Sequence, residues 1–380
     1  MTEGPLLEAL HSRRYIGGFT HTFYRYPAAA SPELVRELVV RLSRPEDYVL
    51  DPFMGGGTTI VEALAHGRRA LGFDVNRLAL LIARAKTTPL TARDRDCISE
   101  WIQADPLRVP WLGTQDRRAA NLPDEIRHPI GAALSALDHL DNSRQRTFVR
   151  CALLRIGQWA LEARDASPGV ETLHRKLNET IQGMLKGLDQ FVESARAHGV
   201  PKSGIVEGRR LLGVGAVTAA DSPLLSRVKG QVRLVLTSPP YPGVHVLYHR
   251  WQVRSRKETA APYWIARHKD GCGPSYYTMG GRSRIGEARY FSELESAFRA
   301  VRPLLKTDAL VVQIVAFSDA SRQLARLEQA MENAGYVESQ LVGGSREVVR
   351  DVPNRRWYAR GKEYDAAREY ILFHSLAKGK

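Results

Sequence analysis

A glycine-rich turn between a β-favouring run and a helical run constrains the fold of this 380-residue chain more than any other feature. The run Tyr48-Val49-Leu50 leads into DPFMGGGTT (Asp51 to Thr59), and a helical pattern follows as far as Gly67. A second apolar run, Arg69 to Asn76, contains an acidic residue near its end and precedes another helical pattern. This alternation predicts a parallel sheet with helices on both faces and a ligand site at the carboxyl ends of the strands.

Helical spacing interrupts the strand signals in the middle of the chain. It dominates from about Thr88 to Ser203, and strand-like runs then resume. We therefore expect an α/β fold, with a Rossmann-like, mostly parallel sheet of seven strands and a helical insertion. Besides the two strands already described, the expected strands are Leu211 to Ala219, Val232 to Tyr241, Ala309 to Phe317, Gly335 to Gly344 and Glu369 to Leu376.

The chain is expected to divide into three parts. Residues 1–88 form the N-terminal part of the sheet domain and carry the glycine turn. Residues 89–205 form the helical insertion. Residues 206–380 form the C-terminal part of the sheet domain, which includes a basic and aromatic loop at 243–290.

The charge and the cysteines limit the classes of function. The chain has 55 Lys and Arg against 41 Asp and Glu, a net charge of +14 that attracts polyanions such as nucleic acid. Cys97, Cys151 and Cys272 are widely spaced, so neither a disulfide framework nor a cysteine-rich zinc site is indicated, and we expect no metal. Neither a signal-peptide core nor an apolar run of membrane-spanning length occurs, which favours a cytoplasmic protein without a membrane partner.

The glycine turn is suited to binding a nucleoside. Small residues let a ligand approach the backbone, and the helix that follows offers free N–H groups. No Lys follows the glycines, so an ATP-type phosphate loop is disfavoured. Asp74, about twenty residues later, can accept both hydroxyls of a ribose, and Asp221 can accept from an adenine amino group. In the alternative interpretation the glycines form an ordinary tight turn, and both aspartates cap helices.

The segment TSPPY (Thr237 to Tyr241) follows an apolar strand and is the second feature with chemical content. Two consecutive prolines make a stiff, extended turn that cannot continue a sheet. Such a turn can hold the Ser238 hydroxyl and the Pro239 carbonyl as acceptors for a planar amino group, with Tyr241 stacked on the base. The nitrogen lone pair then points at an electrophilic methyl group, and no strong base is needed. The alternative is a structural Pro-Pro turn with a buried tyrosine.

Together, DPFMGGGTT, FDVN and TSPPY resemble the cofactor and catalytic motifs of DNA methyltransferases that modify exocyclic amino groups. The segment HTFYRYPAAASPELVREL resembles the stretch of these enzymes that covers the methionine part of the cofactor. The likeness spans about residues 19–88 and 211–245 and is weaker through the last strands. It implies S-adenosylmethionine as cofactor and double-stranded DNA as substrate. Many relatives with TSPPY have the catalytic motif first, so the order here is permuted and the target-recognition region is not located.

The resemblance also implies roles for the matched residues. SPPY occurs in this family mainly with cytosine-N4 methylation, whereas DPPY or NPPY goes more often with adenine-N6. Ser238 therefore favours cytosine-N4, with adenine-N6 as the alternative. The implied catalytic residues are Ser238, Pro239, Pro240 and Tyr241. The implied cofactor-binding residues are Tyr26, Pro27, Ala28, Asp51, Pro52, Phe53, Gly55, Gly57, Thr58, Asp74, Asn76, Asp221 and Thr237.

Arginines interleaved with aromatic residues follow the catalytic motif, as is expected where phosphates are neutralised and a displaced base is stacked. A duplex hides the reacting amine, so we expect the target base to rotate into a pocket beside Tyr241. The alternative is an aromatic cover with a solvated basic rim. We expect the helical insertion to recognise or embrace DNA, with a scaffolding role as the alternative. The expected DNA-binding residues are Arg250, Trp251, Arg254, Arg256, Arg282 and, in a second basic loop, Arg355.

Three other functions fit the sequence less well. A carbon-5 cytosine methyltransferase needs a nucleophilic Cys, usually after a Pro, and no Cys in this chain follows a Pro. An RNA methyltransferase acting on a guanine amino group usually carries Asp in place of Ser238, and only 50 residues precede Asp51 to house an RNA-capture domain. A DNA-binding protein that keeps the fold without catalysis is the third alternative. The recognised DNA site, the oligomeric state and any companion restriction endonuclease or defence system are not determined by the sequence.

Overall fold

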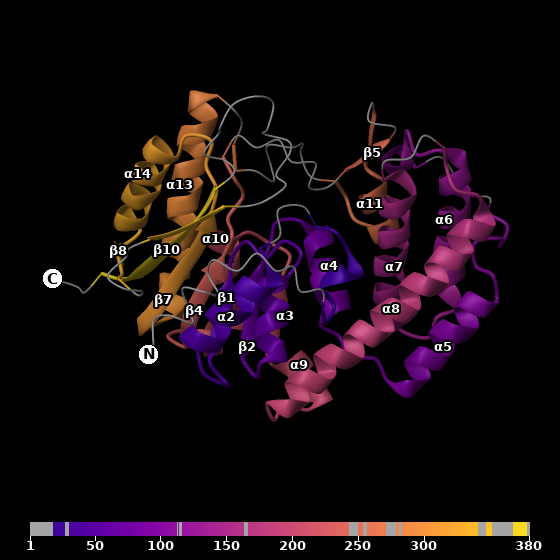
Figure 1. Ribbon diagram of the computed structural model, residues 1–380, viewed down its shortest axis with the longest axis horizontal. Helices are drawn as coiled ribbons and strands as arrows, with labels where there is room; N and C mark the ends of the chain where they lie inside the picture. The colour runs from indigo at the N-terminus through magenta and orange to yellow at the C-terminus, as the bar shows by residue number, and fades with distance from the viewer. Residues whose placement is uncertain are drawn as a thin grey trace.

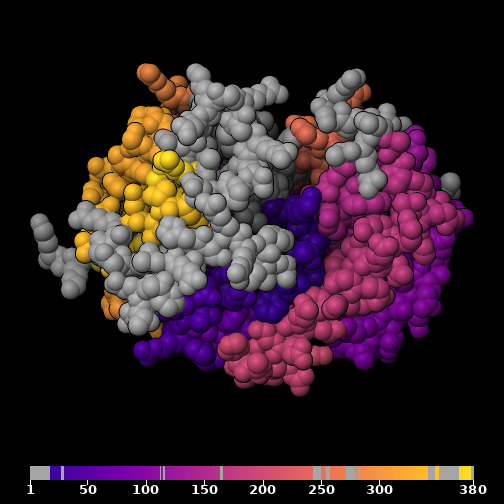
Figure 2. Space-filling view, viewed as in Figure 1, coloured from indigo at the N-terminus to yellow at the C-terminus, as the bar shows by residue number. Residues whose placement is uncertain are grey.

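The computed structural model describes residues 18–26, 30–111, 113, 116–162, 166–242, 250–253, 257–270, 279–280, 283–340, 347–351 and 368–377. The molecule has two adjoining parts, a sheet covered by helices and a lobe of helices beside it (Figure 1). In the space-filling view, indigo N-terminal residues of the sheet part lie against the magenta helices of the lobe (Figure 2). One apolar cluster, which includes Val49 in the sheet and Leu153 in the lobe, runs through both parts.

One sheet is formed by β1 (Tyr48–Asp51), β2 (Arg69–Phe73), β3 (Arg209–Leu212), β4 (Val232–Thr237), β7 (Leu305–Val315), β8 (Tyr336–Glu338), β9 (Glu347–Asp351) and β10 (Arg368–Leu376). Their order is β3-β2-β1-β4-β7-β10-β8, and β9 pairs with β10 next to β8. Neighbours from β3 to β7 are parallel, whereas β10 is antiparallel to its three partners. Because Leu50 pairs with Val235, β1 and β4 end side by side.

Helices cover both faces of this sheet. Consecutive side chains of a strand point to opposite faces, so each strand contributes to two cores. Val49 packs in one apolar cluster and Leu50 in the other. The first cluster is covered by α2 (Pro32–Leu42), α3 (Thr58–Ala65) and α4 (Arg77–Lys86), and the second by α10 (Ala216–Ala220), α13 (Arg284–Val301) and α14 (Ala320–Asn333).

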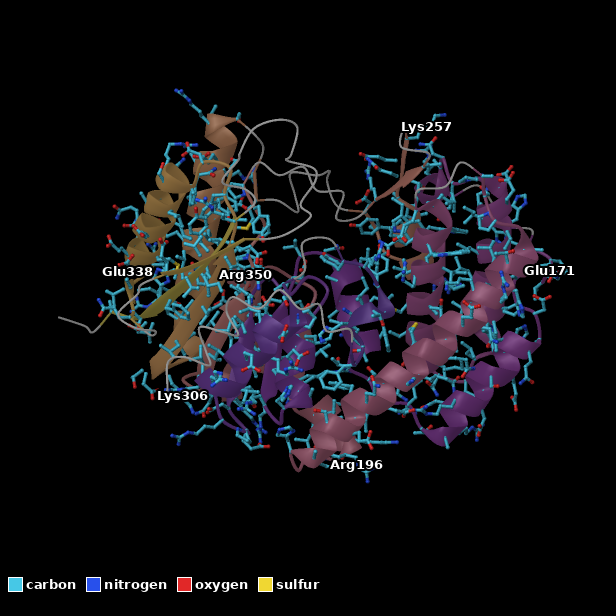
Figure 3. All side chains as sticks on the ribbon, viewed as in Figure 1. Glu171, Arg196, Lys257, Lys306, Glu338 and Arg350 are labelled. Carbon is cyan, nitrogen blue, oxygen red and sulfur yellow. The ribbon has the colours of Figure 1, made fainter. Side chains whose placement is uncertain are left out.

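The lobe consists of α5 (Ala92–Gln103), α6 (Asp124–Ala136), α7 (Ser143–Leu161) and α8 (Val170–Ala197), followed by the short α9 (Lys202–Glu207). In Figure 3 the labelled Glu171 and Arg196 mark the two ends of α8. Capping boxes begin α5 at Thr91 and α7 at Asn142, and Asn142 Nδ2 donates to Asp94 Oδ1 at 2.7 Å, which ties the two helix starts together. None of the helices in the described part of the chain is long and apolar enough to cross a membrane.

A segment that comes after β4 in the sequence also packs into the lobe. It forms a two-stranded ribbon, β5 (Trp251–Val253) with β6 (Lys257–Thr259), and then α11 (Ala261–Ala266). The guanidinium of Arg150 in α7 donates to the Ile265 carbonyl at 2.7 Å, and that of Arg118 donates to the His268 carbonyl at 2.6 Å. The lobe is therefore built from two stretches that are separated in the sequence by the strands β3 and β4 and the helix α10.

The expected α/β class with a mostly parallel sheet is confirmed, but several strands differ in extent from those expected. The strand expected at Ala309 to Phe317 runs from Leu305 to Val315, and the run from Arg69 ends as a strand at Phe73. The run from Leu211 ends as a strand at Leu212, because α10 begins at Ala216 after a glycine-containing turn. The run from Val232 ends as a strand at Thr237, where the prolines begin. Within residues 335–344 only Tyr336–Glu338 forms a strand among the described residues. An eighth strand, β9, lies in the expected basic loop, since the nine-residue β10 has room to pair with both β8 and β9.

Candidate active site

A cavity lies at the carboxyl ends of the parallel strands. The glycine turn follows β1 and the Pro-Pro turn follows β4, and both turns line this one cavity. It holds about 1070 Å³ of empty space, part of it open to solvent, which is enough for a nucleoside-sized ligand. Its lining residues are Tyr26, Ala30, Asp51, Pro52, Phe53, Met54, Gly55, Gly56, Thr58, Thr59, Asp74, Val75, Gly215, Ala216, Leu236, Thr237, Ser238, Pro239, Pro240, Met279, Glu293 and Ile314.

Side-chain hydrogen bonds connect the two turns. The Thr237 hydroxyl donates to Asp51 Oδ1 at 2.6 Å, and the backbone N–H of Phe53 donates to the same oxygen at 3.1 Å. From the start of α3, the Thr59 hydroxyl donates to the Leu236 carbonyl at 3.2 Å. Asp51 and Thr237 are both buried, so these bonds are shielded from water. The ends of β1 and β4 are thereby held in one arrangement.

Two enclosed carboxylates give the cavity its electrostatic character. Burial raises the pKa of Asp51 to about 6, although hydrogen bonds from Thr237 and Phe53 act in the opposite direction. Burial also raises the pKa of Asp74 to about 7, and the nearby Asp51 adds to the rise. Asp74 accepts from the backbone N–H of Gly55 at 2.9 Å and from that of Asn76 at 2.7 Å. Because burial disfavours both ionised carboxylates, a cationic ligand in the cavity would offset the cost of ionising them.

The glycine turn lies against Tyr26. Gly55 and Gly57 adopt positive φ angles of 47° and 77°, which only glycine accepts without strain. A Cβ atom on Gly56 would lie 2.7 Å from the Cβ atom of Tyr26, so this position has no room for a side chain. The Tyr26 hydroxyl accepts from Asn76 Nδ2 at 3.3 Å. Tyr26 is thus placed over the turn, while Pro27 and Ala28 lie outside the described residues.

Eleven of the residues that the sequence suggests for catalysis or cofactor binding line the cavity. They come from the segment before α2, the turn after β1, the end of β2 and the turn after β4. These residues are Tyr26, Asp51, Pro52, Phe53, Gly55, Thr58, Asp74, Thr237, Ser238, Pro239 and Pro240.

Four suggested residues do not line the cavity. Gly57 is the N-cap of α3, where a Cβ atom would lie 3.0 Å from that of Ala83. Asn76 is buried as the N-cap of α4, and its Oδ1 accepts from Leu78 N at 3.0 Å. Asp221 is exposed at the C-terminal end of α10, because the run before it is a helix and not a strand. Tyr241, which the sequence suggests for stacking on the target base, is buried, with 6% of its surface exposed, and is not among the lining residues.

The residues suggested for DNA binding take structural positions where they are described. Trp251 is 5% exposed and its Nε1 donates to the Tyr24 hydroxyl at 3.0 Å, so its indole packs in the core of the lobe. Arg250 pairs with Asp270 at 2.8 Å and with Glu258 at 3.8 Å. Tyr263, Trp264 and Tyr290 are buried as well, which fits the aromatic-cover interpretation for this part. The remaining candidates, Arg254, Arg256, Arg282 and Arg355, lie outside the described residues.

Lys86 is a functional candidate that sequence reasoning missed. It is buried, and its Nζ donates to the Gly56 carbonyl at 2.8 Å, which supports the glycine turn from below. Burial lowers its pKa to about 8. The available signal was its position in LALLIARAK, where it follows Leu78 and Ile82 at helical spacing and so falls on the buried face of α4. In the described part of the chain, no group of three or more His, Cys, Asp or Glu is arranged to hold a metal ion.

Comparisons with known proteins find sequence similarity in the first part of the chain. Residues 9–84, which include the glycine turn and Asp74 but not the Pro-Pro turn, match a family described as DNA methylase. The Type II methyltransferase M.MvaI of Kocuria varians is 45% identical over 74 residues, 19% of this chain and 16% of that protein. The Type II methyltransferase M2.DpnII of Streptococcus pneumoniae is 37% identical over 62 residues, 16% of this chain and 23% of that protein. The matched segment is thus less than a quarter of either relative.

Likeness to solved structures is low. A geranyl diphosphate methyltransferase structure has a TM-score of 0.32 and 10% identity, and covers 98% of this chain and 92% of its own. An antibiotic-resistance methyltransferase, Kmr, has a TM-score of 0.29 and 9% identity, and covers 91% of this chain and 94% of its own. Scores of this size do not support a comparison of the sites.

Proposed function

We propose that this chain, a member of the amino-group DNA methylase family through its residues 9–84, is an S-adenosylmethionine-dependent DNA methyltransferase that acts on cytosine-N4. One observation carries the proposal: the glycine turn and the Pro-Pro turn line the same cavity and are joined by the bond from Thr237 to Asp51. Methyl transfer requires such convergence, because donor carbon and acceptor nitrogen must be held within reach of each other.

The residues of the cavity fit S-adenosylmethionine in size and charge. The cofactor, when bound, supplies an electrophilic methyl group on a sulfonium cation. Asp51 and Asp74 provide negative charge for a cationic ligand, and burial raises the pKa of each in its absence. Asp74 lies at the end of β2, where a carboxylate can accept ribose hydroxyls. Gly55 leaves room for the ligand beside the backbone, and Phe53 supplies an apolar contact.

Ser238 and Pro239 orient the target amine in this proposal. The Ser238 hydroxyl and the Pro239 carbonyl can accept its two hydrogens, and both residues line the cavity. Holding both hydrogens disfavours delocalisation of the nitrogen lone pair into the ring. In the transfer the nitrogen would gain a bond to the methyl carbon as that carbon's bond to sulfur breaks, which would leave a neutral thioether, and the methylated nitrogen would lose one proton to water. Ser238 would hold the amine in place for this step. The choice of cytosine-N4 over adenine-N6 is supported by the serine at this position.

The distribution of charge suggests which side of the molecule faces DNA. Residues 89–205 contain 16 Lys and Arg against 15 Asp and Glu, whereas residues 206–380 contain 28 against 17. Arginines are paired with acidic residues in both parts, such as Arg95 with Asp189 in the lobe and Arg299 with Glu295 in the C-terminal part, so the surplus of positive charge is what distinguishes the two. Phosphate contacts need unpaired positive charge. We therefore assign the duplex to the C-terminal part and a mainly scaffolding role to the lobe.

The deciding experiment supplies the full chain with labelled S-adenosylmethionine and either duplex DNA or tRNA. Label is expected in the DNA, and digestion to nucleosides is expected to yield N4-methylcytosine. N6-methyladenine would correct the target base and leave the enzyme class intact. Label in tRNA alone would show the RNA-directed alternative. Binding of DNA without any transfer, across varied sequences, would leave the catalytically inactive alternative. A companion restriction endonuclease or defence partner remains a further proposal, tested by co-purification.

A further inference from the structure

The end of the cavity next to β3 lacks a side chain that can accept a hydrogen bond from a base. The residues that line it there are Gly215 and Ala216, at the start of α10. Asp221, which the sequence suggests for this contact, is exposed at the other end of α10 and does not line the cavity. A nucleoside in this cavity therefore needs an acceptor for its base from another element.

Glu293 is the carboxylate that remains. The acidic residues among the described lining are Asp51, Asp74 and Glu293. The two aspartates already accept hydrogen bonds from the protein interior, Asp51 from Thr237 and Asp74 from two backbone N–H groups. Glu293 uses its Oε1 for the Arg289 guanidinium at 2.6 Å, and no partner of its Oε2 is found among the described residues. Its side chain is 38% exposed and lines the cavity, so the carboxylate is within reach of solvent and of a ligand there.

The order of the strands determines which end of a bound cofactor lies near Glu293. A ribose held by Asp74 at the end of β2 has β3 on one side and β1, followed by β4, on the other. The sulfonium must point to β4, where Ser238 lies, so the adenine must point to β3 and the start of α10. Helix α13, which carries Glu293 near its middle, packs against α10 on the same face of the sheet.

We infer that Glu293 accepts a hydrogen bond from the exocyclic amino group of the cofactor's adenine and so selects an adenosyl ligand. This inference rests on the proposed function. A hypoxanthine base has a carbonyl oxygen in place of the amino group, and a carboxylate repels it. Glu293 is thus a specificity-determining residue contributed by the helix after the catalytic strand, in place of the third-strand aspartate that the sequence suggests.

The test compares two ligands by calorimetry on the full-length protein. These are S-adenosylhomocysteine and its deaminated form, S-inosylhomocysteine, each titrated into wild type, Glu293→Ala, Glu293→Gln and Glu295→Ala. Glu295 is the matched control, because it lies on the same helix, pairs with Arg299 and does not line the cavity. Wild type and Glu295→Ala should prefer the adenosyl ligand by on the order of tenfold or more. Glu293→Ala should lose most of this preference, and Glu293→Gln should keep part of it.

The outcomes separate this inference from the proposed function. Wild type that binds neither ligand would remove the cofactor assignment itself. Wild type that binds S-adenosylhomocysteine, together with a Glu293→Ala variant that keeps the full adenosyl preference, would overturn the inference alone. A structural role for Glu293 would weaken both ligands equally and leave their ratio unchanged, which also counts against the inference. A rise in the KM for DNA with an unchanged ligand ratio would assign Glu293 to the target base instead, and would likewise overturn it.

Discussion

The Thr237 hydroxyl donates to Asp51 Oδ1 at 2.6 Å, although the two residues are 186 positions apart in the sequence. Both side chains are buried at the ends of adjacent parallel strands, so the bond joins the cofactor-type turn to the catalytic-type turn. It also opposes the effect of burial on the pKa of Asp51, which stands at about 6. The hydrogen bond between Thr237 and Asp51 therefore affects both the spacing of the two turns and the protonation of Asp51.

Thr237→Val should raise the pKa of Asp51, because an ionised carboxylate loses a hydrogen bond that favours it. At neutral pH a larger fraction of Asp51 would then be protonated. The pH midpoint for binding of S-adenosylhomocysteine should move up by roughly one unit, measured by calorimetry across the neutral range. Thr237→Ser keeps the hydroxyl and serves as the control. Identical pH profiles for the valine variant and wild type would contradict this role of the bond.

Asp74 should make the unliganded protein less stable as the pH rises. Its folded pKa of about 7 lies above the ordinary value of 3.8, so its favourable contribution is complete below the unfolded pKa and is lost as pH rises through the folded pKa. The difference in unfolding free energy between wild type and Asp74→Asn should change by ~2 kcal/mol between about pH 4 and about pH 8, in favour of the variant at the higher pH. Urea titrations at both pH values measure it, and a constant difference would show that Asp74 does not titrate in this way.

Ser238→Ala should remove one of the two acceptors for the target amine. We expect kcat for methyl transfer to fall by about 10²–10⁴, while the affinity for S-adenosylhomocysteine stays within about twofold, since the hydroxyl acts on the amine and not on the cofactor. Single-turnover transfer to duplex DNA, together with calorimetry, gives both quantities. Transfer at the wild-type rate would rule out the catalytic assignment of Ser238.

Gly56→Ala should weaken cofactor binding through Tyr26. The new Cβ atom would lie 2.7 Å from the Cβ atom of Tyr26, so Tyr26, which lines the cavity, must shift. We expect S-adenosylhomocysteine to bind at least ~10-fold more weakly. Gly183→Ala on the exposed side of α8 is the control, because no atom lies within 4 Å of the new Cβ. That variant should keep its affinity and gain about 0.5–1 kcal/mol of stability, as measured by urea unfolding. Equal affinities in the two variants would contradict the role given to Tyr26.

Trp251→Phe should affect stability and not DNA binding. The indole is buried in the lobe and donates to the Tyr24 hydroxyl at 3.0 Å, and loss of that bond should cost about 1 kcal/mol of unfolding free energy. Trp251→Ala should cost about 3–5 kcal/mol, because it also opens a cavity against Gly157. Fluorescence anisotropy with a labelled duplex is expected to give the same Kd for wild type and Trp251→Phe. A large loss of DNA affinity in the phenylalanine variant would instead support a DNA-binding role for Trp251.

Local patterns determined the elements around the cavity. The glycines after Leu50 stop a strand and start a helix because glycine adopts the positive φ angles found at Gly55 and Gly57. The prolines after Thr237 end the next strand because they cannot donate to a ladder. In a parallel sheet both turns must then emerge at the same edge, so the sequence was enough to predict that they meet.

Only the tertiary structure decided which individual side chains reach the cavity. The run before Asp221 was expected to be a strand and is a helix, because the same apolar pattern is compatible with both and packing against α13 decided for the helix. The burial of Trp251 could not be predicted locally, because an aromatic residue beside arginines has the same pattern whether it faces DNA or the core of the lobe. Glu293 gave no local signal, since its position on the cavity depends on how α13 packs over the sheet. Contacts between distant segments carry no local periodicity, and for that reason the sequence alone determined the two turns and their shared edge, while the fold decided what surrounds them.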